Sequence, residues 1–273
     1  MNFFGNNTDE TLTGSAGDDY LDGGAGNDTI DGGANGPYGD IVGFGSATTG
    51  VNVNLEAGVI GNDGTGGVDA IVNVEHVNGT PFDDTLVGNA FNNGFQPGAG
   101  NDYVDGGAGS GDHVKYDDAT AAVTVNLLTG QASGVSIGND TLVGIEGVHG
   151  SAFDDVITLR GGYVLGLGGN DLLKGDSGDE FFIGGSGNDT INGASGYDTA
   201  NYEDTYDPAD QVAPIAGVTV NLATGIATDN WGDTDTLISI EYVFGSPYAD
   251  HLIGGNPANG SAATDGFVGF RGN

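Results

Sequence analysis

Aspartate residues recur at one fixed place in a short, glycine-rich pattern. Its clearest copies run over residues 23–31 and 184–192, and in each the sixth of nine residues is an aspartate, Asp28 or Asp189. The glycines of such a turn expose backbone carbonyl oxygens, and the aspartate adds a carboxylate. Both are hard oxygen donors, and Ca²⁺ is coordinated by six to eight oxygen ligands of this kind. Because one turn supplies too few ligands, we expect one ion between two stacked turns, with binding coupled to folding.

The overall charge favours the same chemistry. The 273 residues include 39 acidic and only 4 basic ones, for a formal net charge of −35. The acids are spaced along the chain, so a compact state repels itself unless cations enter it. Four dispersed cations form no basic patch, which argues against nucleic acid and anionic lipid as partners. No apolar run approaches the about 18 residues of a membrane span, so we expect no direct membrane insertion. The lack of cysteine excludes disulfides and thiolate metal sites.

The two ends of the sequence also lead to expectations. Residues 1–4 show neither a basic nor an apolar signal region, so we expect no cleavable secretion signal there. The sequence stops at residues 270–273 inside a degenerate repeat, without an evident C-terminal export signal or solenoid cap. We therefore expect a fragment of a longer protein, with head-to-tail stacking of copies as the alternative.

Nine-residue repeats predict the architecture. Near copies begin at Gly5, Gly14, Pro97, Gly166 and Gly175, and degenerate ones at Gly32, Gly88, Gly106, Gly193 and Gly254. Positions one to six are turn residues, and positions seven to nine are a short strand with one apolar residue at position eight. A single apolar side chain per repeat makes a core only when coils stack. The inward residues are predicted to be Leu12, Leu21, Ile30, Leu86, Phe95, Val104, Ile157, Leu173, Phe182, Ile191 and Leu252. Helical periodicity is absent, so very little helix is expected.

A longer, strand-rich segment occurs three times between the short repeats. It opens with Val-x-Val-Asn-Leu at Val51, Val123 and Val218, and continues to Val-Glu-His-Val or a similar motif ending at Val77, Val148 and Val243. These long segments are expected to form wider coils of the same stack. The predicted organisation is one continuous solenoid over 1–273, with short repeats at 5–45, 79–118, 150–202 and 245–273 and long segments at 46–78, 119–149 and 203–244.

The nonapeptide resembles the calcium-binding repeat of the RTX (repeats-in-toxin) family. The resemblance implies an all-β, right-handed parallel β-roll with calcium between successive turns on each edge. Carried over position by position, it implies carboxylate ligands at Asp19, Asp28, Asp40, Asp102, Asp112, Asp171, Asp189 and Asp198. It also implies carbonyl ligands at Gly14, Gly23, Gly26, Gly166, Gly184 and Gly187.

Five further turns depart from this pattern and are left outside the predicted ligand set. Asp84 and Asp155 close turns in which Phe replaces the fourth glycine. Glu10 and Glu180 are longer than aspartate, which displaces the carboxylate, and Asn93 carries no charge.

The expected function is that of a calcium-binding structural or adhesive module, secreted or on a bacterial cell surface, which folds on calcium after type I export. No catalytic residue is predicted, because the carboxylate pairs repeat along the chain and the four histidines match no HExxH motif. Two alternatives stay open. One is a calcium-dependent module that binds extracellular polysaccharide, and the other is the RTX region of a secreted protease or lipase whose catalytic domain lies outside this chain.

Overall fold

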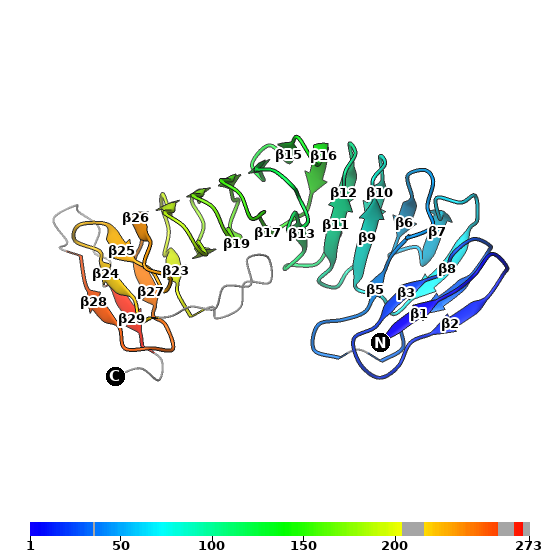
Figure 1. Ribbon diagram of the computed structural model, residues 1–273, viewed down its shortest axis with the longest axis horizontal. Helices are drawn as coiled ribbons and strands as arrows, with labels where there is room; N and C mark the ends of the chain where they lie inside the picture. Colours follow the sequence, from blue (N-terminus) through cyan, green and yellow to red (C-terminus); the bar gives the residue numbers. More distant parts are fainter. Residues whose placement is uncertain (35, 204–215, 256–264, 270–273) are drawn as a thin grey trace. The chain divides into compact units, whose positions relative to one another are not determined.

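The computed structural model describes residues 1–34, 36–203, 216–255 and 265–269. Within these ranges the chain forms only short strands, turns and bends, with no helix. The strands belong to two compact units, each described by itself (Figure 1). The N-terminal unit holds Met1–Tyr116 and Gly130–Ile145, and the C-terminal unit holds Asp117–Thr129 and Glu146–Asn273. The expected all-β class is confirmed. The prediction of one continuous solenoid over 1–273 is a statement about how the two units are connected, and it stays a prediction.

The N-terminal unit contains two sheets. The strands of the first are β1 (Asn2–Phe4), β3 (Tyr20–Asp22), β5 (Ile41–Val42), β9 (His76–Thr80), β11 (Gly94–Gly98) and β13 (His113–Lys115). The strands of the second are β2 (Thr11–Thr13), β4 (Thr29–Asp31), β6 (Asn52–Asn54), β7 (Val59–Asn62), β8 (Asp69–Val72), β10 (Thr85–Val87), β12 (Tyr103–Asp105), β15 (Gln131–Gly134) and β16 (Gly138–Val143).

Successive strands of the short repeats alternate between these two sheets, which is the path of a solenoid. Neighbours within a sheet are therefore two repeats apart and parallel, as in β1–β3–β5–β9–β11–β13. In the second sheet β2, β4 and β8 pair in parallel, as do β6, β10, β12 and β16. Leu12 pairs with Ile30 and Leu86 with Val104, so apolar residues align from coil to coil.

The C-terminal unit repeats this plan. The strands of its first sheet are β17 (Gly147–His149), β19 (Gly162–Leu165), β21 (Glu180–Ile183), β23 (Thr199–Asn201), β27 (Tyr242–Phe244) and β29 (Gly266–Val268). The strands of its second are β14 (Val123–Asn126), β18 (Val156–Thr158), β20 (Leu172–Lys174), β22 (Thr190–Asn192), β24 (Thr219–Asn221), β25 (Ile226–Thr228), β26 (Thr234–Ile238) and β28 (His251–Ile253). The first sheet is parallel throughout, and β14, β18, β20, β22 and β26 run parallel in the second.

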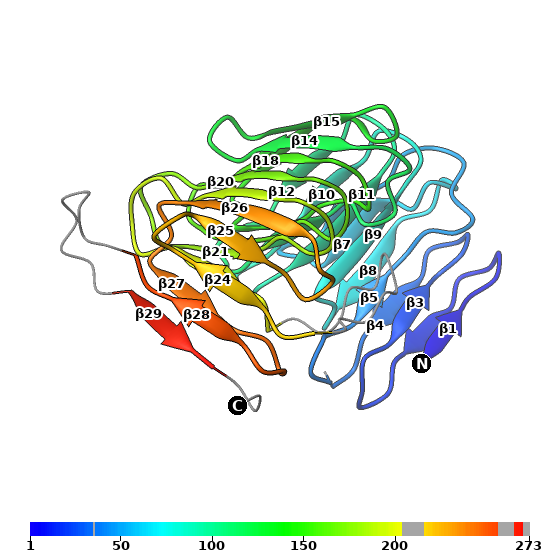
Figure 2. The same cartoon turned by 60° about the vertical axis from the view of Figure 1, so that its left-hand side comes forward.

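The long segments add antiparallel strands to the second sheet of each unit. In the N-terminal unit β7 lies antiparallel between β6 and β8, and β15 pairs antiparallel with β16. In the C-terminal unit β25 lies antiparallel between β24 and β26 (Figure 2). A long segment therefore widens one side of its coil with a meander, while the parallel stack continues on both sides of it within the unit.

The core is the predicted ladder of position-eight side chains. All of those named above except Leu252 are buried, and Leu252 is half-buried. The start of the first long segment also shows the expected alternation of buried apolar and exposed polar residues, since Val51 and Val53 are buried while Asn52 between them is exposed. The expectations about the chain's last residues, 270–273, lie outside the described residues, as do parts of the predicted 203–244 and 245–273 segments. No helix of the described chain is long and apolar enough to cross a membrane.

Candidate metal centres

The sixth-position carboxylates form rows along the edges of each unit. In many of them one oxygen accepts a hydrogen bond from the backbone of the equivalent residue one coil back in the same row. Asp189 Oδ1 accepts from the Asp171 amide at 2.9 Å, and Asp171 Oδ1 accepts from Asp155 at 2.8 Å. In the N-terminal unit Asp40 accepts from the Asp19 amide and Asp102 from the Asp84 amide, both at 2.8 Å. The parallel stacking of coils thus creates the rows.

The second carboxylate oxygen differs from turn to turn. In several turns it is buried and has no hydrogen-bond partner within the described chain. These residues are Asp28, Asp40, Asp102, Asp171, Glu180, Asp189 and Asp198. An unpaired buried carboxylate oxygen costs free energy, which a bound cation removes. Six of these seven belong to the predicted ligand set, and Glu180 adds a residue that sequence reasoning had left out because of its length.

Backbone carbonyls meet these oxygens at the first glycine of each turn. A side chain at Gly166 would overlap both Asp171 Oδ2 and the carbonyl oxygen of Gly184, which lies one coil further along the row. At Gly32, a Cβ would lie 2.6 Å from Asp40 Oδ2 and would overlap the carbonyl oxygen of Asn73. Only glycine leaves room for two oxygens from different coils to face the same space.

The second residue of the turn controls which backbone group faces the site. Gly24 has φ 82° and Gly107 has φ 94°, so both lie in the left-handed region. Their N–H groups donate to Asp22 Oδ1 at 3.0 Å and Asp105 Oδ1 at 3.1 Å, at the end of the preceding repeat, rather than to the sixth-position aspartate. In the turn of Gly24 that aspartate is Asp28, whose second oxygen has no hydrogen-bond partner within the described chain. We call turns of this kind, which leave a buried carboxylate oxygen without a partner, open turns.

A second kind of turn satisfies its own aspartate. Thr80 donates to Asp84 through its backbone N–H at 2.6 Å and through Oγ1 at 2.8 Å. Ser151 donates to Asp155 in the same way, at 2.6 and 2.7 Å. We call these hydroxyl turns, since a Ser or Thr stands at the second position. They explain why Asp84 and Asp155 differ from the predicted ligands, for a reason other than the fourth-position Phe.

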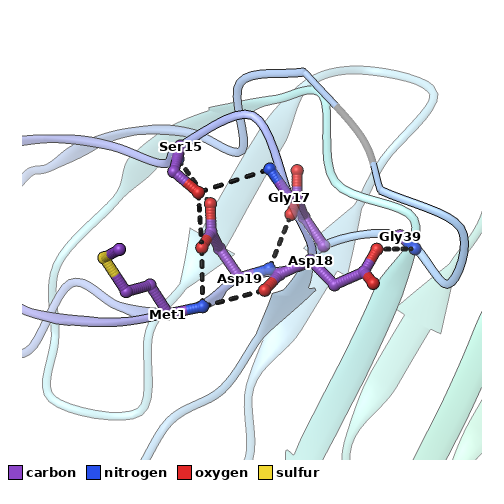
Figure 3. Close-up of polar contacts among 7 residues, drawn as sticks. Met1, Ser15, Gly17, Asp18, Asp19 and Gly39 are labelled. Atoms are coloured by element: carbon purple, nitrogen blue, oxygen red, sulfur yellow. Dashed lines mark hydrogen bonds and ion pairs between the residues drawn. The ribbon is translucent and has the colours of Figure 1, made fainter.

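Asp19 was predicted as a ligand, but it stands in a hydroxyl turn. Ser15 Oγ donates to Asp19 Oδ1 at 3.0 Å, and the Ser15 amide donates to Oδ2 (Figure 3). The α-amino group of Met1 also lies 2.7 Å from Oδ1, and this contact lowers the pKa of Asp19. Asp18 beside it faces away and accepts from the Gly39 amide at 2.8 Å. Asp19 is therefore a predicted ligand whose two oxygens are both satisfied by protein donors, unlike the aspartates of the open turns.

The remaining predicted ligands lie at the same edges. Asp112 Oδ1 accepts from the Asn93 amide at 2.6 Å, and Asn93 itself is satisfied by the Asn89 amide and the Glu75 carbonyl. The Gly23 and Gly166 carbonyls face Gly5 and Gly150 of neighbouring coils. The carbonyl oxygen of Gly26 faces Gly67, and the carbonyl oxygen of Gly14 would lie 3.3 Å from a Cβ added at Gly33. Gly187 (φ 121°) packs against the Gly169 carbonyl.

Burial strongly disfavours charge on the open-turn carboxyls. Desolvation raises the pKa of Asp171 to about 9, and the neighbouring Asp189 adds to the effect. Desolvation likewise raises the pKa of Asp102 and of Asp189 to about 8, with Asp140 and Asp235 as the next contributors. A divalent cation at these positions reverses this preference, because it stabilises the carboxylate form.

The donor set fits calcium. The described residues contain no group of three or more His, Cys, Asp or Glu side chains placed to hold a metal ion. A cation here would therefore draw on carboxylate and backbone carbonyl oxygens from two coils, which suits a hard ion with many ligands and flexible geometry. Asp171 with the Gly184 carbonyl, and Asp40 with the Asn73 carbonyl, are the clearest such pairs.

Two histidines that look unrelated in the sequence lie together. Strands β9 and β13 flank β11, and His76 and His113 both pair with Gly94. Their ring centroids are 5.7 Å apart, and His76 Nε2 donates to the Tyr38 carbonyl at 2.5 Å. Burial lowers the pKa of His113 to about 4. Two neutral imidazoles provide only two donors, so this pair alone makes no complete metal site.

Comparison with known proteins gives one match. A family model described as "RTX calcium-binding nonapeptide repeat (4 copies)" matches residues 4–35, 78–111 and 165–200. No curated protein matches the chain. The matched segments contain most of the open turns described above, and they alternate with the long segments. These three segments therefore carry RTX calcium-binding nonapeptide repeats.

Proposed function

We propose that this chain is a calcium-dependent folding module of an extracellular or cell-surface protein, with a structural rather than a catalytic role. The observation that supports it is the set of open turns, each with a buried carboxylate oxygen that no protein donor of the described chain satisfies. The matching family is a family of calcium-binding repeats rather than of catalytic domains. Adhesion, self-stacking, polysaccharide binding and attachment to a secreted enzyme stay predictions.

The energetic argument concerns the state without calcium. A net charge of −35 and a core with one apolar residue per repeat leave little to oppose chain entropy. Each ion that binds only the folded state adds stability by mass action, about 2.7 kcal/mol at a hundredfold excess over its dissociation constant. Extracellular calcium-binding modules work at millimolar calcium, whereas calcium is scarce inside cells. The module would therefore fold after export.

Circular dichroism of the whole chain tests the proposal. In excess chelator we expect a spectrum of unfolded chain, and added calcium should restore a β-rich spectrum cooperatively. Magnesium at the same concentration is the matched control, because its smaller octahedral shell suits carbonyl-rich turns poorly. A β-rich spectrum that is the same in chelator and in calcium would contradict the proposal.

A further inference from the structure

The first and third long segments each contain a loop that stacks on a preceding turn of one row, the turn of Asp28 in the first segment and the turn of Asp189 in the third. In the first, Asp28 donates its amide to Asp69 Oδ1 at 2.8 Å, and Val68 donates to Asn27 Oδ1 at 3.1 Å. In the third, the Asp189 amide donates to Asp235 Oδ1 at 3.1 Å. Residues 63–69 and 229–235 therefore take the place of the next nonapeptide turn in the row.

These loops do not repeat the carbonyl arrangement of an ordinary turn. At Gly166, the next coil of the row brings the Gly184 carbonyl against Asp171 Oδ2. The three atoms that a Cβ at Gly23 would meet first all belong to Asp28, and those that a Cβ at Gly184 would meet first all belong to Asp189. The turns of Asp28 and Asp189, the last of their row before these two long segments, thus have an unpaired carboxylate oxygen, and no carbonyl of the next coil is among the three nearest atoms at their first glycine.

An additional carboxylate stands in each loop. Asp63 is 2 % exposed and Asp229 is 1 % exposed. Asp229 Oδ1 accepts from the amides of Trp231, Gly232 and Asp233 at 2.7–3.0 Å, which fixes the side chain. Its other oxygen, Oδ2, is buried and has no hydrogen-bond partner among the described residues.

Asp63 has the same anchoring in the first long segment. Its Oδ1 accepts from the amides of Thr65, Gly66 and Gly67 at 2.7–2.8 Å, and its Oδ2 accepts from Thr65 Oγ1 at 2.8 Å. A side chain at Gly67 would overlap both Asp63 Oδ2 and the carbonyl oxygen of Gly26. Asp63 Oδ2 therefore lies beside a carbonyl of the same turn that carries Asp28.

The second long segment shows that this carboxylate is not needed for the loop. Its loop also stacks on the preceding turn, because the Asp102 amide donates to Asp140 Oδ1 at 3.1 Å and a side chain at Gly138 would overlap the Gly100 carbonyl. Aligned from the closing motifs at Val77, Val148 and Val243, the residue in place of Asp63 and Asp229 is Gly134. The extra acids in the other two segments therefore call for a separate explanation.

We propose that Asp63 and Asp229 are additional calcium ligands, which complete the sites of Asp28 and Asp189 with a carboxylate from outside the nonapeptide motif. The inference rests on the proposed function. Two carboxylates at one site raise its affinity for a divalent ion relative to a site with one, because affinity follows the number of charged ligands. The turns of Asp28 and Asp189 would then bind calcium at least as well as the other open turns.

The single tryptophan gives a local readout for the third long segment. Trp231 donates its amide to Asp229, so an ion at Asp229 lies close to the only indole in the chain. Tb³⁺, a hard cation that replaces calcium at oxygen sites, should emit on selective excitation of tryptophan in the wild type. In Asp229→Asn, which keeps Oδ1 for the three amides, this emission should be lost. Equal emission from both proteins, or none from a wild type that still folds on calcium, would overturn the proposal.

Calorimetric titration of calcium tests the first long segment. Asp63→Asn should lose about one bound ion, or bind it about tenfold more weakly, with the other sites unchanged. Glu56→Gln is the matched control, since Glu56 is exposed in the same segment and should titrate like the wild type. Wild-type titration in both variants would refute Asp63 as a ligand. A wild type with no calcium response at all would instead refute the proposed function.

Discussion

Open turns and hydroxyl turns occupy equivalent places in the solenoid but treat the same carboxylate in opposite ways. In the hydroxyl turn of Asp155, Ser151 supplies both a hydroxyl and a backbone N–H, and both carboxylate oxygens are satisfied. In the open turn of Asp171, the second oxygen is buried without a partner in the described chain and faces the Gly184 carbonyl. The first turn is complete as a protein structure, whereas the second requires a proton or a cation.

The difference arises at the second position of the turn. A residue in the left-handed region, such as Gly185 with φ 99°, turns its amide away from the aspartate, whereas Ser151 directs its amide to it. The fourth position follows the same division, because Gly187 has φ 121° while Phe153 occupies the corresponding place in the hydroxyl turn. Backbone conformation thus separates the open turns that carry an aspartate from the hydroxyl turns, whereas in the open turn of Glu180 neither Asp176 nor Gly178 is in the left-handed region.

The largest expected effect is an opposite pH dependence with and without calcium. In the metal-free fold the pKa of Asp171 is about 9 and that of Asp102 and Asp189 about 8, against 3.8 for an ordinary aspartate. The folded state then binds more protons than the unfolded one, so its stability is greatest below about pH 4 and falls as the pH rises through 8–9. With calcium bound, acidification should instead destabilise the protein, because protons compete for the same oxygens.

Differential scanning calorimetry between about pH 5 and pH 9, in chelator and in saturating calcium, measures both slopes. If the chain is unfolded in chelator at neutral pH, refolding on mild acidification is the corresponding observation. Slopes of the same sign under both conditions would contradict the distinction between a proton-filled and a cation-filled open turn.

Gly166→Ala should have the next largest effect. The new methyl group would overlap Asp171 Oδ2 and the Gly184 carbonyl, so both the packing of the coils and the candidate site are disturbed. We expect a loss of about 3 kcal/mol in calcium, at the upper end for overpacked positions. Gly17→Ala in the hydroxyl turn of Asp19 is the control, because its nearest neighbour would be Ser15 Oγ at 4.0 Å. Equal calcium-dependent melting temperatures for the two variants would argue against close packing as the role of the first glycine.

Asp171→Asn and Asp155→Asn should differ in how their cost depends on calcium. Asp171→Asn removes a ligand and a buried charge, so we expect a loss of about 2–3 kcal/mol at a hundredfold calcium excess over the dissociation constant and a much smaller loss near the dissociation constant. Asp155→Asn loses an acceptor for the Ser151 amide, which should cost about 1–2 kcal/mol at both calcium concentrations. Denaturant unfolding at two calcium concentrations separates the two. Parallel losses in both variants would remove the basis for dividing the turns into two kinds.

Ser151→Ala should have the smallest effect. It deletes the hydroxyl that donates to Asp155 and accepts from the Phe153 amide, at a cost of about 1 kcal/mol that does not depend on calcium. Ser177→Ala, at an exposed residue in the open turn of Glu180, should be close to neutral. A calcium-dependent change at Ser151 would show that hydroxyl turns also hold ions.

The sequence alone predicted much of this protein because its repeat encodes local structure. One apolar residue every nine positions, flanked by turn-forming glycines, has no core unless coils stack, so residues such as Leu21, Phe95 and Leu173 were recognisable as core. Most of the carboxylates at the sites were recognisable for the same reason. The antiparallel strands of the long segments were not, since an alternating pattern reports a strand but not the direction of its neighbour.

Other features were decided only by the tertiary structure. The turns of Asp19 and Asp28 both contain the expected aspartate, but only Asp28 keeps an oxygen without a hydrogen-bond partner in the described chain. The difference is that the Ser15 amide points toward Asp19 and donates to it. Glu180 joins its row because the neighbouring coil positions it, with its amide bonded to Asp198 at 2.9 Å. Asp63 and Asp229 reach the turns of Asp28 and Asp189 across about 40 residues of chain. Local propensity determines a turn and its carboxylate, whereas the groups that reach this carboxylate from other coils follow only from the stacking of coils.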